Sequence, residues 1–233
     1  MPCYTLVMNI KFLGTGGAFD WQYGTSAATV QTKDTLFLVD CGPSAFPQLM
    51  KHELIDKIDY VVLTHLHGDH VGSLFQVLCQ RSIMGLATPI LSPSDVFTET
   101  IAQLLDLQRF DRERDNFIPI NNVPTISALD TTGQHVPDML NYAYYFSEDD
   151  ELIYYSGDIG RIETAVDFLK DRTESNIRVF HDAHHLNGLS HTHYTVVNEQ
   201  LKNYETYLYH CNPEKIPADN TMPLVSSVPE LNW

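Results

Sequence analysis

Four side chains of types that commonly bind metal ions occur between residues 65 and 70 of this sequence. The segment reads Thr64-His65-Leu66-His67-Gly68-Asp69-His70. In an extended chain, residues i and i+2 point to the same side, so His65 and His67 can hold one metal ion together. Gly68 permits a sharp turn, after which Asp69 and His70 begin a helix and point back at the same pocket. Imidazole and carboxylate groups suit zinc, iron or manganese, and this spacing predicts a site for two ions.

The elements that must position these side chains are short strands alternating with helices. A buried strand is expected at Tyr60–Leu63, directly before the histidines. The other expected strands are Ile10–Leu13, Ala27–Gln31, Leu36–Val39, Asn141–Phe146, Glu151–Tyr155 and Ile177–Phe180. The expected helices are Gly72–Gln80, Val96–Gln108 with Ser94 as its N-cap, Ile162–Leu169 and Tyr194–Asn203. Sheets interleaved with helices indicate a layered α/β domain.

The H-x-H-x-D-H spacing after a strand resembles the signature of the metallo-β-lactamase superfamily. That resemblance implies an α/β fold, a four-layer αββα sandwich that forms a single hydrolase domain over residues 1–211. Two further segments, Leu13–Ala18 and Val39–Gly42, resemble the ribonuclease Z-like branch of the superfamily. The match extends from about residue 10 to residue 200.

The same resemblance implies ligands from later segments. Tyr155-Ser156-Gly157-Asp158 is similar to the S-G-D of the branch, whose aspartate bridges both ions, and His135 precedes a strand where the branch has its third histidine ligand. Phe180-His181-Asp182-Ala183 and His191-Thr192-His193-Tyr194 resemble the two late histidines of the branch. The resemblance therefore implies one ion on His65, His67, His135 and Asp158, and a second on Asp69, His70, Asp158 and His191. His193 is the alternative to His191.

The resemblance also implies how such a site would work. Two divalent ions, zinc with manganese as the alternative, would activate a water for attack on a phosphorus or carbonyl centre. Asp69 would orient that water, and His181 would protonate the leaving oxygen. Asp40 is a candidate acceptor for the N–H of a ligating imidazole. Four other histidines are expected at the surface: His52, His184, His185 and His210.

The charge of the chain argues against a polynucleotide substrate. Its 14 Lys and Arg against 30 Asp and Glu give a formal net charge of −16, which repels a polyanion. Arg109, Arg112 and Arg114 alternate with acidic residues, so this stretch is interpreted as a solvated helix end. Ribonuclease Z enzymes carry a long basic arm between the third histidine and the bridging aspartate, whereas here Asp158 follows His135 by 23 positions. The intervening loop, Ser147–Asp150, is acidic, so tRNA processing is not expected.

A small cyclic phosphodiester is the substrate class that remains. The short core resembles the compact cyclic-nucleotide phosphodiesterases of the branch, including phage anti-Pycsar proteins, which degrade cyclic CMP and cyclic UMP. The alternative is a 5-phosphoribosyl 1,2-cyclic phosphate phosphodiesterase; a tRNA 3′-processing endonuclease and a lactonase are less favoured. Phe19, Trp21 and Tyr23 lie in a loop expected to overhang the metals, where they either stack on a base or pack beneath the loop. Arg161 could touch a phosphate, but a helix start is favoured.

The remaining expectations concern the tail and the environment of the chain. Residues 212–233 contain four prolines without clear periodicity, so we expect either disorder or docking onto a partner subunit of a homodimer. No apolar run is long enough to span a bilayer, and the N-terminus lacks the pattern of a secretory signal. The four cysteines lie far apart, which is typical of reduced thiols. A cytoplasmic protein without membrane partners is expected, in a host cell if it is viral.

Overall fold

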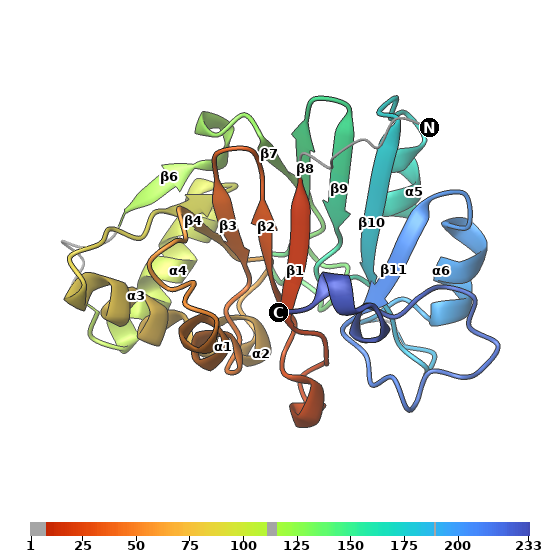
Figure 1. Cartoon of the computed structure of the whole chain (residues 1–233), viewed down its shortest axis with the longest axis horizontal. Helices are drawn as coiled ribbons and strands as arrows, with labels where there is room; N and C mark the ends of the chain where they lie inside the picture. Colours follow the sequence, from red (N-terminus) through yellow and green to blue (C-terminus); the bar gives the residue numbers. More distant parts are fainter. Residues whose placement is uncertain (1–7, 111–115, 189) are drawn as a thin grey trace.

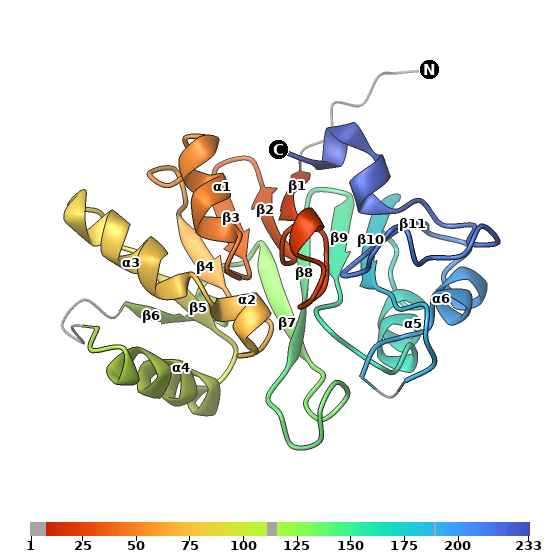
Figure 2. The same ribbon diagram turned by 90° about the horizontal axis from the view of Figure 1, so that it is seen from below.

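Two β-sheets packed face to face form the centre of the molecule (Figure 1). The structure is a computed structural model that describes residues 8–110, 116–188 and 190–233. Helices lie on the outer side of each sheet, so the layers run helix, sheet, sheet, helix (Figure 2). The four-layer αββα architecture expected from the metal-binding motif is therefore confirmed.

The first sheet carries the histidine-rich segment at one edge. Its strands, in spatial order, are β1 (Asn9–Gly14), β2 (Ala27–Gln31), β3 (Leu36–Val39), β4 (Tyr60–Val62), β5 (Ile90–Ser92) and β6 (Phe117–Pro119). β1, β2 and β3 pair antiparallel, and β3 to β6 pair parallel. The carboxyl ends of parallel strands meet at one edge, so the segment after β4 emerges beside the end of β3.

The second sheet has the spatial order β11 (Glu205–Tyr209), β10 (Asn176–Asp182), β9 (Glu151–Tyr155), β8 (Tyr142–Glu148) and β7 (Ile126–Asp130). β9, β10 and β11 pair parallel, while β7, β8 and β9 pair antiparallel. The three parallel strands therefore end at a common edge. Asp158 follows β9 at that edge, and His210 directly follows β11.

Helices cover both outer faces. Around the first sheet lie α1 (Ala45–Lys51), α2 (Gly68–Val71), α3 (Leu74–Ile83) and α4 (Asp95–Leu107), and against the second lie α5 (Glu163–Leu169) and α6 (Tyr194–Gln200) (Figure 2). Short 3-10 turns occur at Trp21–Tyr23, Ile120–Asn122, Val225–Ser227 and Pro229–Leu231. The Ser94 hydroxyl accepts from the backbone N–H of Phe97 at 3.2 Å, which confirms this residue as the N-cap of α4. No helix in the described part of the chain is long and apolar enough to cross a membrane.

Aromatic side chains fill the space between the two sheets. Phe12 of β1 lies 5.7 Å from Phe180 of β10 and 5.4 Å from Tyr209 of β11, measured between ring centroids. Phe37 of β3 meets Phe146 of β8 at 5.2 Å in an edge-to-face arrangement. All five rings are buried. Because each strand alternates its side chains between two faces, this packing fixes which residues at the strand ends point into the gap between the sheets.

Most of the expected elements are confirmed to within a few residues. Among the α-helices and strands of the described residues, those not predicted are α1, β5, β6, β7 and β11, because each is short and lacks a clear period. The stretch that begins at Arg109 was expected to form a solvated helix end. This is wrong for Arg109, because α4 ends at Leu107. The rest of that stretch, residues 111–115, lies outside the described residues.

The C-terminal segment, residues 212–233, packs on its own chain. Leu224 pairs with Leu208 of β11, and Val225 and Leu231 are buried. The backbone N–H of Trp233 donates to the carbonyl of Phe12, and its indole Nε1 donates to Thr29 Oγ1 at 2.9 Å. The expectation of disorder is therefore wrong, because these apolar side chains find their partners on β1, β2 and β11 of the same subunit.

Candidate metal centre

The H-x-H-x-D-H segment adopts the conformation that brings its ligands together. His67 has an extended backbone and immediately precedes α2, which contains Asp69 and His70. His65 Nε2 lies 3.1 Å from His67 Nδ1, so these two rings do point to the same side. α2 approaches the loop after β3 so closely that a Cβ on Gly42 would overlap the carbonyl oxygen of Asp69. Glycine at position 42 is therefore required for this approach.

Three imidazoles form a first group of donors: His65, His67 and His135. His135 Nε2 lies 3.0 Å from His67 Nδ1, so ring nitrogens of all three converge on one point. The other nitrogen of His135 donates to the carbonyl of Ser190 at 2.7 Å, which leaves the Nε2 lone pair facing the group. Burial lowers the pKa of His65 and His67. Neutral imidazoles with converging lone pairs are what a metal ion binds.

A second group consists of Asp69, His70, Asp158 and His210. His210 Nε2 lies 3.3 Å from Asp69 Oδ2 and 3.2 Å from Asp158 Oδ2. His70 Nε2 lies 3.4 Å and 3.3 Å from the same two oxygens. Two carboxylates and two imidazoles thus surround one position, a donor set suited to a divalent ion.

Asp158 lies between the two groups. Its Oδ2 is 3.9 Å from His65 Nε2 and 3.8 Å from His135 Nε2 in the first group, besides its contacts in the second. Its other oxygen, Oδ1, is buried without a hydrogen-bond partner among the described residues. A buried carboxylate oxygen without a partner is costly unless a cation neutralises it. The position of Asp158 therefore fits a ligand shared by two ions.

The carboxylates around His70 favour added positive charge in the second donor group. Burial lowers the pKa of His70, but Asp158 and Asp40 overcome this effect and raise it well above its usual value. The buried carboxylates thus favour added positive charge at this position. A divalent ion would supply that charge. The residues present thus fit a metal ion.

Asp40 supports His70 from behind. Its Oδ2 lies 2.8 Å from His70 Nδ1, and the backbone N–H and hydroxyl of Thr64 donate to the same carboxylate. Asp40 is fully buried and has a φ of 60°. The backbone of Asp40 is therefore strained, and its carboxylate orients the ring of His70. Asp40 is thus the acceptor expected from the sequence.

The structure contradicts the expectation that His210 is a surface residue. The side chain is buried and belongs to the second donor group, because β11 ends at Tyr209 on the same edge as β9 and β10. His52 and His185 are partly exposed, and His184 is a partly exposed residue that lines the cavity described below. The sequence contained one signal for this role of His210. The residue directly follows the aromatic-rich segment Thr206–Tyr209, and candidate ligands in this fold follow strand ends.

His191 occupies a different place from the one expected. Its Nδ1 donates to Asp182 Oδ2 at 2.9 Å and lies 3.9 Å from Asp158 Oδ2. The ring lines the cavity and forms a third possible donor group with His135 and Asp158, but it is not part of the second group, where His210 is present instead. Burial lowers the pKa of His191, but the hydrogen bond to Asp182 outweighs this and raises it to about 9. His193, the alternative ligand, lies outside all three donor groups and contacts Thr195 Oγ1 and the carbonyl of His185.

The expectation that His181 is the proton donor is also contradicted. Successive residues of β10 face opposite sides of the sheet, and Asp182 faces the site, so His181 faces away. Its ring is fully buried, Nδ1 contacts the backbone carbonyl of Asp182, and the residue does not line the cavity. A ring enclosed in this way cannot protonate a substrate bound at the metal groups.

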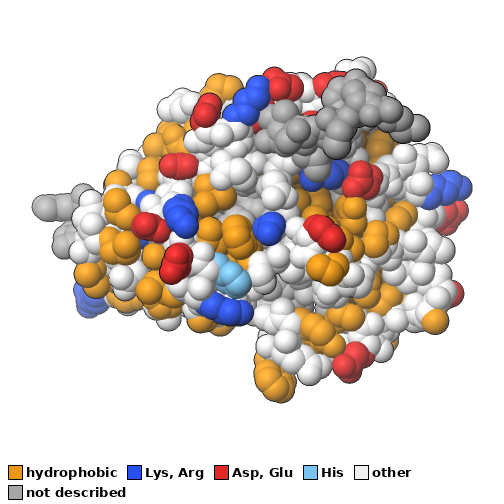
Figure 3. Space-filling view, in the orientation of Figure 1, with side chains coloured by type: hydrophobic (Ala, Val, Ile, Leu, Met, Phe, Trp, Pro, Cys, Tyr) orange, Lys and Arg blue, Asp and Glu red, His pale blue; other side chains and the backbone are white. Residues whose placement is uncertain are grey.

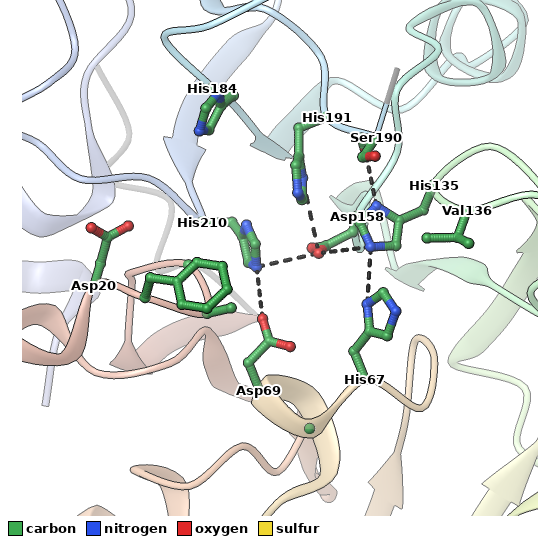
Figure 4. Close-up of a pocket in the computed structure, with 14 residues that line it drawn as sticks. Asp20, His67, Asp69, His135, Val136, Asp158, His184, Ser190, His191 and His210 are labelled. Atoms are coloured by element: carbon green, nitrogen blue, oxygen red, sulfur yellow. Dashed lines mark hydrogen bonds and ion pairs between the residues drawn. The ribbon is translucent and has the colours of Figure 1, made fainter. Parts of the chain in front are cut away.

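A cavity of about 580 Å³ opens above the donor groups (Figure 4). Its lining combines donor residues with the loop after β1 and with the segments around His135 and His191; the residues are Gly17, Ala18, Phe19, Asp20, His67, Gly68, Asp69, His135, Val136, Asp158, His184, Ser190, His191 and His210. This volume suits a small organic ligand.

Solved structures share this fold. The metallo-β-lactamase fold protein YhfI from Bacillus subtilis aligns with a TM-score of 0.69 at 19% identity, covering 88% of this chain and 86% of that one. Human tRNase Z, short form, aligns with a TM-score of 0.64 at 20% identity, covering 88% and 93%. The fold is thus that of the metallo-β-lactamase class, and its carboxylate–imidazole groups suit divalent metal ions.

Sequence similarity to known proteins identifies the family within this class. The anti-Pycsar protein Apyc1 of Paenibacillus sp. (strain J14) is 28% identical over 210 residues, which cover 82% of this chain and 82% of the relative. Residues 8–226 match the family model of the anti-Pycsar protein Apyc1. The chain belongs to this family, in agreement with the resemblance seen in its motifs.

Proposed function

We propose that this protein hydrolyses 3′,5′-cyclic mononucleotides, with pyrimidine nucleotides among its substrates, to linear nucleoside monophosphates. The role would be that of a phage protein that evades cyclic-nucleotide antiviral signalling. Membership of the Apyc1 family supports this proposal. A small substrate, rather than RNA, is favoured by the segment between His135 and Asp158.

That segment holds no arm that could grip a polynucleotide, and this observation carries the proposal. β8 and β9 form a tight hairpin whose turn is Asp149 and Asp150. The turn is held against the β2–β3 connection of the same chain, where Lys33 Nζ lies 2.7 Å from Asp149 Oδ2 and its backbone N–H donates to Glu148. An acidic turn that is paired within its own subunit does not serve as a clamp for RNA.

The size of the site and the charge of the surface also favour a mononucleotide over a polynucleotide as the substrate. A cavity of about 580 Å³ accommodates a mononucleotide. The net charge of −16 opposes a polyanion, and the face in Figure 3 mixes Lys and Arg with Asp and Glu without a continuous basic track. A single phosphodiester is repelled far less, because salt screens exposed charges beyond about 8–10 Å.

Each donor group would hold one divalent ion, and zinc is the metal we favour for these imidazole and carboxylate ligands. His65, His67 and His135 would hold the first ion, and Asp69, His70 and His210 the second, with Asp158 shared. Bound ions would supply a Lewis acid for the phosphate and a water of lowered pKa as the nucleophile.

Two side chains would move protons during hydrolysis. Asp69 lines the cavity and would accept the proton of the attacking water as its oxygen bonds to phosphorus. Protonated His191, oriented by Asp182, would donate its proton to the ester oxygen as the opposite phosphorus–oxygen bond breaks. The cyclic diester and water thereby give one linear monophosphate.

The test is a substrate panel with metal-loaded enzyme. It contains 3′,5′- and 2′,3′-cyclic mononucleotides, cyclic dinucleotides, phosphoribosyl 1,2-cyclic phosphate, a lactone and a pre-tRNA, and products are resolved by chromatography. We expect 3′,5′-cyclic mononucleotides to become linear monophosphates and pre-tRNA to stay intact. Cleavage of pre-tRNA alone, or of phosphoribosyl 1,2-cyclic phosphate alone, would refute the proposal.

A further inference from the structure

The connection between β1 and β2 exposes two large aromatic side chains beside the metal centre. We call residues Gly17–Tyr23 the aromatic loop. Phe19 is 95% exposed and Trp21 is 87% exposed, more than any other large hydrophobic residues in the described chain. The loop projects from the lower edge of the molecule, where hydrophobic atoms lie at the tip of the space-filling surface (Figures 1 and 3). Exposed aromatic side chains next to a cavity are typical of a surface that contacts a ligand.

The three aromatic residues of the loop differ in position. Phe19 lines the cavity that contains the metal groups, whereas neither Trp21 nor Tyr23 is among its lining residues. Tyr23 is partly buried, and its hydroxyl donates to Glu214 at 3.1 Å. Of the three, Phe19 is therefore the residue that can touch a ligand in the cavity.

The loop is fixed in its place by contacts at both sides. Asn212 donates to Asp20 Oδ1 at 2.9 Å, and the backbone N–H of Cys211 donates to the carbonyl of Thr15. Gly17 lies directly on a candidate metal ligand, since a Cβ added there would be 3.3 Å from His210 Cε1. The backbone that carries Phe19 is thus held beside the metal groups before any ligand binds, which lowers the entropic cost of contact.

We propose that Phe19 is the base-recognition residue of the site and stacks on the nucleobase of the bound nucleotide. This inference rests on the proposed function and names the part of the substrate that the aromatic loop contacts. With the phosphate at the metal groups, the base extends toward the cavity wall that contains Phe19 and Asp20; Asp20 and Val136 lie on opposite sides of the cavity (Figure 4). A phenyl ring stacks on any base, so recognition at this wall is tolerant of base identity.

Steady-state kinetics on matched substrates and variants test this assignment. The substrates are cyclic CMP, cyclic AMP and methyl β-ribofuranoside 3,5-cyclic phosphate, which has a methoxy group in place of the base. The variants are Phe19→Ala, Phe19→Tyr as the aromatic rescue, and Trp21→Ala as a control of similar exposure outside the cavity. Loss of one base–aromatic stack should raise KM for both nucleotides about 5- to 150-fold in Phe19→Ala and leave kcat nearly unchanged.

The base-free substrate separates stacking from a general disturbance of the site. Phe19→Ala should cleave it like the wild type, and Phe19→Tyr and Trp21→Ala should behave like the wild type on all three. An equal rise in KM for the base-free substrate, or an unchanged KM for the nucleotides, would overturn the assignment while leaving the proposed function intact. A wild type that cleaves none of the three would reject the proposed function and this inference together. Calorimetric binding of a non-hydrolysable phosphorothioate analogue should show the same loss of affinity in Phe19→Ala.

Discussion

Replacement of His191 by alanine is expected to abolish most turnover without emptying the metal centre. The ring lines the cavity, and its Nδ1 is held by Asp182 at 2.9 Å. It lies near His135 and Asp158, but the proposed ligand set does not include it. Because a positioned general acid contributes about 10²- to 10⁴-fold, kcat for a cyclic nucleotide should fall by that factor. KM should change little, since the proton is transferred only as the leaving oxygen develops charge.

The leaving group gives this prediction its sharpest test. An alkoxide needs a proton as it departs, whereas 4-nitrophenolate does not, so His191→Ala should cleave bis(4-nitrophenyl) phosphate with a much smaller loss than it shows on cyclic CMP. His181→Asn is the matched control, since that ring is buried away from the cavity; it should lower stability and leave kcat within a few fold. Equal losses of His191→Ala on both substrates, or loss of metal from it, would refute this assignment of the acid.

Three further outcomes follow from the packing. His210→Ala should retain about half the metal of the wild type by elemental analysis, and a full complement would exclude it as a ligand. Tyr144→Phe removes a buried hydrogen bond of 2.8 Å to the carbonyl of Leu63 and should cost about 1–2 kcal/mol in denaturant unfolding, whereas Tyr145→Phe should stay within about 0.5 kcal/mol. Deletion of residues 212–233 uncovers apolar surface on β1 and β11 and should lower Tm clearly. We propose that the protein is a homodimer, and equal monomer masses of full-length and truncated protein by light scattering would reject that proposal.

Local patterns predicted the half of the site that is local in sequence. His65, His67, Asp69 and His70 lie on one strand end and the first turn of the next helix, so the periods of strand and helix are enough to bring them together. The same holds for β2 and β3, whose bounds agree with the expected ones because their apolar runs are bordered by polar residues. Asp158 follows the end of β9 by three residues and was predicted from the resemblance of Ser156-Gly157-Asp158 to the S-G-D of the branch.

The late histidines were not decided by local pattern, because their roles depend on sheet order. β11 is an edge strand that pairs parallel with β10, and this pairing alone places His210 opposite Asp69, 141 residues away. His181 and Asp182 are neighbours in sequence, yet the alternation of β10 buries one and points the other at His191. Both roles were therefore predicted for histidines that lie earlier in the chain than the ones the geometry favours.

The tail was misjudged for a related reason. Its prolines and lack of period are typical of an unstructured segment, but Leu224, Val225 and Leu231 contact strands that are distant in sequence. The apolar surface that these side chains cover forms only when β1 and β11 come together in the folded chain. A sequence pattern that reports local structure cannot reveal such a long-range partner.

Anomalous diffraction from crystals of the zinc-loaded protein would locate the bound ions and identify their ligands. We predict two ions, one bound by His65, His67 and His135 and the other by Asp69, His70 and His210, with Asp158 touching both. His191 should lie beside the ions with its Nδ1 still on Asp182, and His181 should remain buried away from them. A single ion, or a second ion bound by His191 in place of His210, would contradict this description of the site.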